Sequence, residues 1–160
     1  MEKQTQHLEF AGDESISVQA LERYLRYFCI VYCSLEKGCE HFEASLSDIG
    51  SIQSIWEALP RETVYEAIRR LYWFPLGIPF DFCEEEELFK ERSVLEDLQI
   101  LSISKNSPLK ITLCGIGIAL TCAVILSGGS IDFSLKGISC KLPPIGEGIE
   151  ALRKAIRKKF

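Results

Sequence analysis

Apolar residues recur at intervals of three and four through residues 18–36, from Leu21 to Leu35. This spacing places them on one face of a helix. Ser17 stands before the segment as a candidate N-cap, and Gly38 follows it as a candidate end. The pattern therefore predicts a long helix with a broad apolar face that is buried on more than one side.

Three shorter helices are predicted by the same spacing. Pro60 ends the first of them, because proline does not continue a helix. The last one carries apolar residues on one side and basic residues near its C-terminus, where cations suit the helix dipole. The predicted ranges are 52–59, 62–71 and 146–159.

Polar and apolar residues alternate in four further segments, which is typical of half-buried strands. Between two of these segments, the turn signal Asn106-Ser107-Pro108 predicts a hairpin. We therefore expect residues 1–160 to form a single α+β domain, with a small, mainly antiparallel sheet covered by helices 18–36 and 115–127. The predicted strands are 7–12, 98–104, 109–114 and 131–141.

The helix 115–127 lies in the longest apolar run of the chain. Residues 111–131 contain no charged side chain. Their hydropathy is in the range at which membrane-spanning helices are predicted. If residues 109–113 form a strand, however, about 13 residues remain, or roughly 20 Å of helix against a hydrocarbon core of ~30 Å. The run has two interpretations, a membrane segment or a buried core helix, and a segment that converts between them is a third.

Small residues stand at every fourth position of this run. Small side chains let a helix approach another helix closely in lipid, and they also let it approach a sheet closely in a soluble domain. The pattern predicts tight packing, but it does not distinguish a membrane segment from a buried core helix. The larger Ile116, Leu120 and Val124 would need lipid or another protein copy if their side is exposed. The small positions are Gly115, Ala119, Ala123 and Ser127.

Phe10-Ala11-Gly12-Asp13 precedes the long, aromatic-rich helix, and the stretch 101–111 precedes the apolar helix, which ends at Gly128-Gly129. This arrangement resembles a group of short, uncharacterised bacterial proteins. Some proteins similar to these sit beside prokaryotic defence or conflict genes, as membrane-associated or adaptor components. The resemblance covers much of the chain and implies an effector or adaptor role without active-site residues.

Charge is distributed unevenly behind the net value of −5. Residues 101–160 carry nine basic and three acidic residues, whereas residues 1–100 carry nine basic and twenty acidic residues. A basic region beside an apolar run suits an anionic membrane surface or an acidic partner, although attraction between the two ends of one domain would explain it as well. The candidate contacts with an anionic surface are Arg153, Lys154, Arg157, Lys158 and Lys159.

The run from Trp73 to Phe80 holds two prolines and several aromatic residues, so we do not expect a regular helix there. We interpret it either as a buried connection or as an exposed docking surface. The candidate docking residues are Trp73, Phe74 and Phe80.

Four Cys and His residues are spaced as C-x3-C-x5-C-x-H, from Cys29 through Cys33 and Cys39 to His41. This spacing matches no common zinc finger, and the first two cysteines lie inside the predicted apolar helix. With seven scattered cysteines and a polar N-terminus without a signal region, we expect reduced, mostly buried thiols in a cytoplasmic protein. We predict neither a metal nor a cofactor.

Gly115-Ile116-Gly117 is similar to the start of a dinucleotide-binding turn, but Leu120 stands where the third glycine is needed. No catalytic constellation is evident, and no basic stretch is interleaved with aromatics as in nucleic-acid-binding proteins. We expect a small non-enzymatic interaction or effector module that associates with itself, a partner protein or the inner face of the membrane, with bacterial defence as its setting. The alternatives are a wholly soluble adaptor or sensor with 115–127 as its core helix and, beyond that, an enzyme on the same scaffold.

Overall fold

The computed structural model describes residues 2–12, 16–42, 52–73, 98–104, 108–135 and 137–160. Within these ranges the chain forms helices and strands whose bounds are as follows. The strands are β1 (Lys3–Phe10), β2 (Gln99–Ser104), β3 (Lys110–Ile116), β4 (Ser130–Ser134) and β5 (Gly137–Leu142). The helices are α1 (Val18–Phe42), α2 (Ile52–Ala58), α3 (Arg61–Trp73), α6 (Gly117–Leu126) and α7 (Ile145–Arg157).

These strands form one sheet in the order β2-β3-β1-β5-β4. The central strand β1 is antiparallel to β3 and parallel to β5, while β2 and β4 pair antiparallel at the two edges. The predicted α+β fold with a mainly antiparallel sheet is confirmed, as is the antiparallel pairing of β2 with β3. The prediction of one strand over 131–141 is wrong. Gly137, with a φ of 123°, allows a tight turn that divides the segment into β4 and β5.

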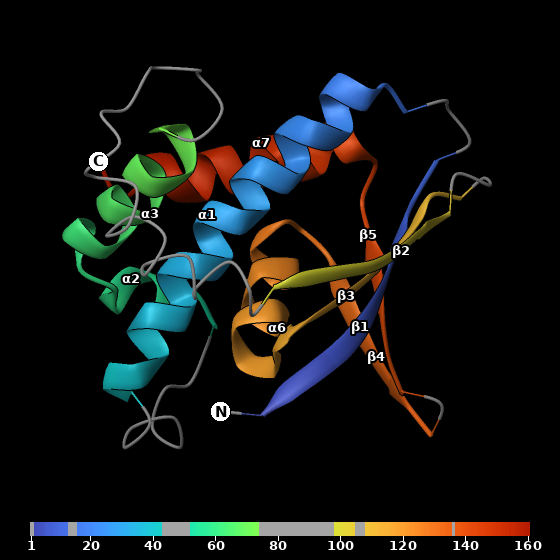
Figure 1. The fold of residues 1–160 in the computed structure, drawn as a ribbon, viewed down its shortest axis with the longest axis horizontal. Helices are drawn as coiled ribbons and strands as arrows, with labels where there is room; N and C mark the ends of the chain where they lie inside the picture. The colour runs from blue at the N-terminus through green and yellow to red at the C-terminus, as the bar shows by residue number, and fades with distance from the viewer. Residues whose placement is uncertain (1, 13–15, 43–51, 74–97, 105–107, 136) are drawn as a thin grey trace, which may run out of the picture.

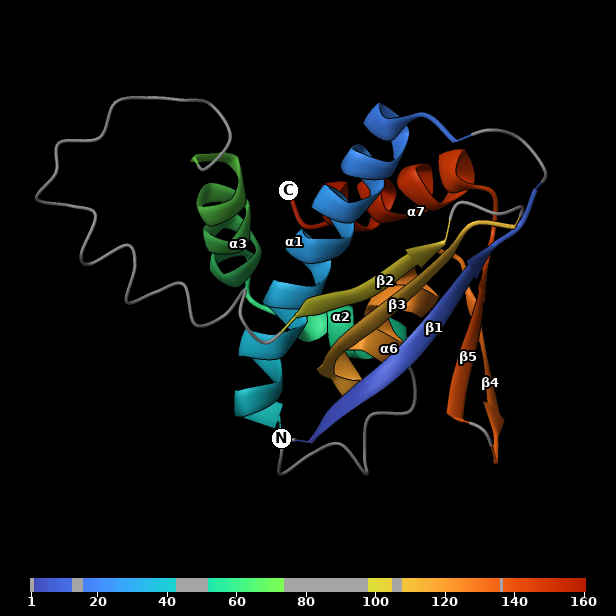
Figure 2. The same cartoon turned by 45° about the vertical axis from the view of Figure 1, so that its right-hand side comes forward.

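The helices lie on one side of the sheet, and no described helix covers the other side (Figures 1 and 2). Along β1, Leu8 and Phe10 are buried whereas Thr5 and His7 are exposed, which is the alternation expected of a sheet with one covered face. Gln6 also points into the core. Its amide nitrogen donates to Thr121 Oγ1 at 3.0 Å, so this buried polar group keeps a partner.

Helix α1 is longer than the sequence predicts, because it continues through Gly38 to Phe42. Gly38 is buried, and a Cβ atom at this position would collide with the side chain of Leu59, which follows α2. The glycine is therefore a point of close approach between two segments rather than a helix end. From the sequence alone, a glycine needed for close packing cannot be distinguished from a glycine that ends a helix.

Helix α6 lies between α1 and the sheet (Figure 1). Its first residue follows β3 directly, and most of its side chains are buried, with Ile118 and Ile125 each 38% exposed. The large residues Leu120 and Val124, which would need an outside cover if exposed, are fully buried inside the chain itself. Within the described ranges, none of the helices combines the length and the apolar character that crossing a bilayer requires.

The four small positions of the apolar run do not share one helix. Gly115 belongs to β3, and a Cβ atom there would lie 2.9 Å from the hydroxyl of Tyr32, which itself accepts a hydrogen bond from the Ile116 N–H at 2.9 Å. The predicted start of the helix at 115 is therefore two residues early. Ala119, Ala123 and Ser127 are fully buried.

Tyr24 connects four elements at the centre of the helical layer. Its ring meets Phe10 of β1 edge to face at 4.9 Å between centroids, and its hydroxyl donates to Ser127 Oγ at 3.3 Å, just after α6. A Cβ atom on Gly148 of α7 would lie 3.0 Å from the same ring. Burial raises the pKa of the Tyr24 hydroxyl well above its ordinary value.

We predict that Ala123→Leu destabilises the protein by about 1–3 kcal/mol, because the added carbons overfill a fully buried position. Thermal or denaturant unfolding monitored by circular dichroism measures this loss. The matched control is Ala58→Leu at the exposed end of α2, which should leave the unfolding midpoint nearly unchanged. Equal midpoints for the native chain and Ala123→Leu would contradict the tight packing of α6.

Candidate functional site: a basic groove between α1 and α7

Helix α7 packs beside α1 and turns one apolar side into the core. Ile149, Leu152 and Ile156 are buried, as their spacing predicts, and Pro144 precedes the first turn. The basic residues of the helix fall on its remaining surface, where Lys154 and Arg157 are exposed and Arg153 is half-buried.

A hollow of about 490 Å³ lies where α1 and α7 meet, and we call it the α1–α7 groove. Its nearly buried floor is formed by Ile149 and Ile156 of α7. Polar and charged side chains from both helices surround this floor. The lining residues are Arg23 and Tyr27 of α1, and Ile149, Glu150, Arg153, Ile156 and Arg157 of α7.

The charges around the α1–α7 groove are unbalanced, with three guanidinium groups and one carboxylate. Arg153 Nη1 lies 3.1 Å from Glu150 Oε1, one turn away on the same helix. For the side chains of Arg23 and Arg157, no ion pair is found within the part of the chain that the structure describes. Among the described residues, the groove therefore presents two positive charges without an ion-pair partner beside an apolar floor.

This arrangement suits an anionic ligand that also has an apolar part. A guanidinium group offers a planar fork of N–H donors that matches a carboxylate or a phosphate. Its charge does not depend on pH in the physiological range. The half-buried ring of Tyr27 and the two isoleucines offer contact area to an aliphatic or aromatic group.

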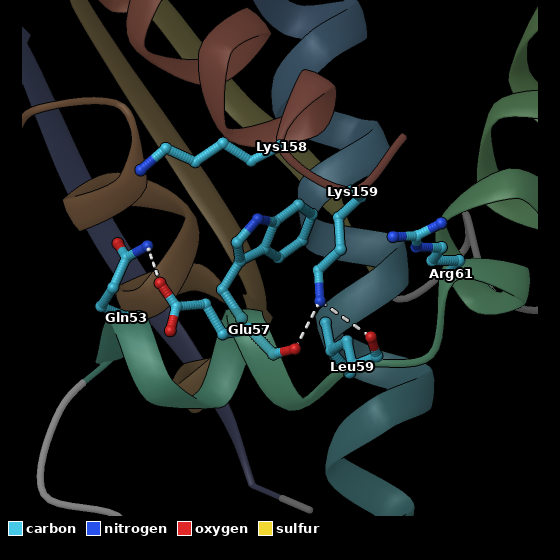
Figure 3. A pocket seen from close by; sticks show the side chains of 7 residues that line it. Gln53, Glu57, Leu59, Arg61, Lys158 and Lys159 are labelled. Carbon is cyan, nitrogen blue, oxygen red and sulfur yellow. Dashed lines mark hydrogen bonds between the residues drawn. The ribbon is translucent and has the colours of Figure 1, made fainter.

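Lys159 is placed differently from the other predicted basic contacts. Only 7% of it is exposed, and its Nζ donates to the backbone oxygens of Glu57 and Leu59, each at 2.8 Å, as Figure 3 shows. The prediction that Lys159 contacts an anionic surface is therefore wrong. Its ammonium group instead satisfies carbonyl groups at the C-terminal end of α2, where the helix dipole favours a cation.

Lys159 also lines a second pocket, of about 240 Å³, together with Trp56 and Glu57 of α2. The indole N–H of Trp56 donates to the Ala155 oxygen at 3.0 Å, and Lys159 Nζ lies 5.8 Å from the centre of the Trp56 ring. Burial lowers the pKa of Lys159, which the Glu57 carboxylate partly opposes. The exposed Lys158 side chain points away from Lys159 across the pocket (Figure 3). These contacts of Lys159 and Trp56 join the C-terminal residues to α2. We call them the Lys159 clamp and interpret them as structural.

The predicted docking run is only partly described. Trp73 is the last residue of α3, whereas Phe74 and Phe80 lie outside the described residues. Of the Cys-x3-Cys pattern, Cys29 and Cys33 both lie on α1, where Cys29 is half-buried and Cys33 is buried. Across the described ranges, no group of three or more Cys, His, Asp or Glu side chains is placed to hold a metal ion.

Arg23 and Tyr27 are the groove residues that sequence reasoning missed. They stand four apart on α1 and therefore share one of its faces. This spacing was a usable signal, but nothing in the sequence indicates that the same face of α1 adjoins α7. No known family model, curated protein or solved structure is significantly similar to this chain, so the site is interpreted from its geometry.

We predict that Lys159→Met lowers the free energy of unfolding by about 1–3 kcal/mol, since two carbonyl oxygens lose their donor. Thermal unfolding of the full chain measures the change. Lys158→Met is the control, because it removes the same charge from an exposed neighbouring position. A loss of the same size in both variants would assign the effect to charge rather than to the clamp.

A further prediction concerns alkaline pH. Burial, together with the nearby Asp132 carboxylate, raises the pKa of the Cys140 thiol from its ordinary 9.0 to about 11. Unfolded chains release this proton near pH 9 while the folded protein keeps it, so this thiol's contribution to stability is complete below pH 9 and is lost as pH rises towards 11. Denaturant unfolding across this window should therefore show a shallower decline for Cys140→Ala.

The control for the thiol experiment is Cys114→Ala, at a half-buried position on β3. It removes a thiol from the same sheet, and a shallower decline confined to Cys140→Ala would support the prediction. Because Lys159 has a lowered pKa, it changes stability in the opposite direction over part of this window, and only the differences between variants are informative. An identical decline for the native chain and Cys140→Ala would contradict the prediction.

Proposed function

We propose that the protein is a non-enzymatic interaction module that binds an acidic segment of a partner protein in the α1–α7 groove. The observation that carries this proposal is the convergence of Arg23, Arg153 and Arg157 on one hollow with an apolar floor. An acidic segment with one or two apolar side chains matches both features. The carboxylates would meet the guanidinium groups, and the apolar side chains would cover Ile149 and Ile156.

The burial of α6 supports the adaptor form of this proposal. Ala119, Leu120 and Ala123 are fully buried within the chain, so their contacts are already made without lipid or a second protein. The surface that remains for an interaction is therefore the outside of the helical layer, where the α1–α7 groove lies. The setting in bacterial defence stays a prediction that rests on the resemblance of the sequence.

An anionic membrane surface is the alternative occupant of the same basic region. Lys154, Arg157 and Lys158 are exposed near the end of α7, where they could approach lipid headgroups. A flat membrane surface would use all exposed cations of α7 about equally. A peptide in the groove would depend on the arginines that line the hollow, and this difference separates the two occupants.

The test measures binding of a fluorescein-labelled peptide of alternating glutamate and leucine residues by fluorescence anisotropy. The double variant Arg23→Gln/Arg157→Gln should weaken binding about tenfold, since it removes two exposed charge pairs that contribute about 0.7 kcal/mol each. The control double variant Lys154→Gln/Lys158→Gln removes two charges outside the groove and should have a much smaller effect. Added salt should weaken binding of the native chain.

Two results would contradict this proposal. Equal weakening by the two double variants would indicate diffuse attraction to the basic end of the chain. Binding to vesicles of phosphatidylserine and phosphatidylcholine, without binding to the acidic peptide, would instead assign the basic surface to membranes. Vesicles of phosphatidylcholine alone serve as the uncharged control for that measurement.

A further inference from the structure

Strand β4 is an edge strand whose backbone is paired on one side only. It pairs with β5 from Ser130 to Ser134 without a register shift, and among the described residues no strand lies on its other side. Such an edge presents a row of N–H and C=O groups that can pair with another strand. The opposite edge, β2, is different, because a register shift between Ile100 and Ser102 interrupts it. Irregularities of this kind are among the features that protect an edge from pairing.

The side chains along β4 are apolar on one face. Ile131 and Phe133 alternate with polar residues, and Leu135 continues the alternation into the turn. Ile131 pairs with the buried Cys140, which places this face on the helical side of the sheet. Ile131 packs against the core, but Phe133 is 76% exposed and Leu135 is completely exposed. In Figure 1 the hairpin of β4 and β5 extends beyond the helices towards its turn.

We propose that β4 pairs antiparallel with β4 of a second copy of this chain, with Phe133 at the two-fold axis. The pattern Ile-Asp-Phe-Ser-Leu is self-complementary in this register. Phe133 faces Phe133, Ile131 faces Leu135, and Asp132 faces Ser134 of the other copy. An axis at Asp132 would place the two Asp132 carboxylates opposite each other, which is unfavourable. An axis at Ser134 would place Ile131 opposite Gly137, which already begins β5 and offers no side chain. Charge and apolar pattern therefore select one register and one occupant.

The resulting dimer has a defined architecture. Residues that face each other across an antiparallel pair point to the same side, so both Phe133 rings lie on the helical side. The two five-stranded sheets become one ten-stranded sheet with the helices of both copies on the same face. The two rings and their apolar neighbours fill the space between the helical layers. Because a stable interface usually buries roughly 1,200–2,000 Å² and β4 is short, we expect a concentration-dependent dimer.

Sedimentation of the full chain over a series of concentrations tests this inference. The native protein should approach twice its monomer mass as concentration rises, whereas Phe133→Asp should remain monomeric. Phe160→Asp is the matched control, since Phe160 is the same residue type and is 60% exposed, and it should dimerise as the native chain does. Phe133 is 76% exposed, so thermal unfolding of Phe133→Asp should match the native chain at concentrations where the native chain is monomeric.

A second measurement reports the register directly. Under mild oxidation, Phe133→Cys should form a disulfide-linked dimer through position 133, identified by mass mapping, at a level above that of the native cysteines. Asp132→Cys should not link to itself, because it faces Ser134 in the proposed register. A native chain that stays monomeric without this cross-link would overturn the proposal. A dimer that survives Phe133→Asp and is lost in Ile103→Asp, on β2, would overturn it in favour of the other edge.

Loss of vesicle binding in Phe133→Asp, with a monomeric native chain, would also overturn the second-copy inference and assign the hairpin to lipid. None of these outcomes depends on the α1–α7 groove. The arginine variants therefore test the proposed function separately from the dimer.

Discussion

The burial of α6 is the constraint on which the rest of the structure depends. This helix carries no charged side chain, so it needs cover on nearly its whole circumference. The sheet covers one side and α1 covers the other, and α2 and α7 contact it as well. The exceptional length of α1 follows from this requirement, because one helix has to cover α6 and also support α3 and α7.

Cover for α6 also determines where the basic residues of the chain can lie. Tyr24 faces inward to Phe10 and Ser127, so the neighbouring positions on α1 face outward. Arg23 is one of these outward positions, and α7 brings Arg153 and Arg157 to the same hollow. Repulsion between these guanidinium groups is tolerated at the surface, where water screens it. A ligand with negative charge would relieve it.

Regular periodicity in the sequence was sufficient for most of the fold. The helix beginning at 18, the strands on either side of Pro108 and the apolar side of α7 were all predicted from spacing alone. Predictions failed where one residue type has two physical functions. Gly38 allows close contact with Leu59 rather than ending α1, and the ammonium group of Lys159 binds carbonyl groups rather than meeting solvent.

The site was only partly predictable for a related reason. Arg153 and Arg157 stand in a basic cluster that composition reveals. Arg23 belongs to an acidic part of the sequence. It joins the site only because α1 packs against α7, and these two helices are more than one hundred residues apart in the chain. The edge position of β4 in the described sheet was hidden in the same way, because the alternation over 131–141 is that of one strand and only the structure shows the turn at Gly137.

The position of β1 in the middle of the sheet has a consequence for how the chain reaches its native state. This first strand pairs only with β3 and β5, so Glu9 meets Lys110 on one side and Lys141 on the other. During synthesis from the N-terminus, β1 cannot form its native pairs until β3 and β5 have been synthesised, which requires most of the chain. Contacts of such long sequence separation slow folding, because loop closure precedes their formation. The apolar side chains of β1 lack their native cover during that interval, and transiently exposed apolar strands of this kind favour aggregation.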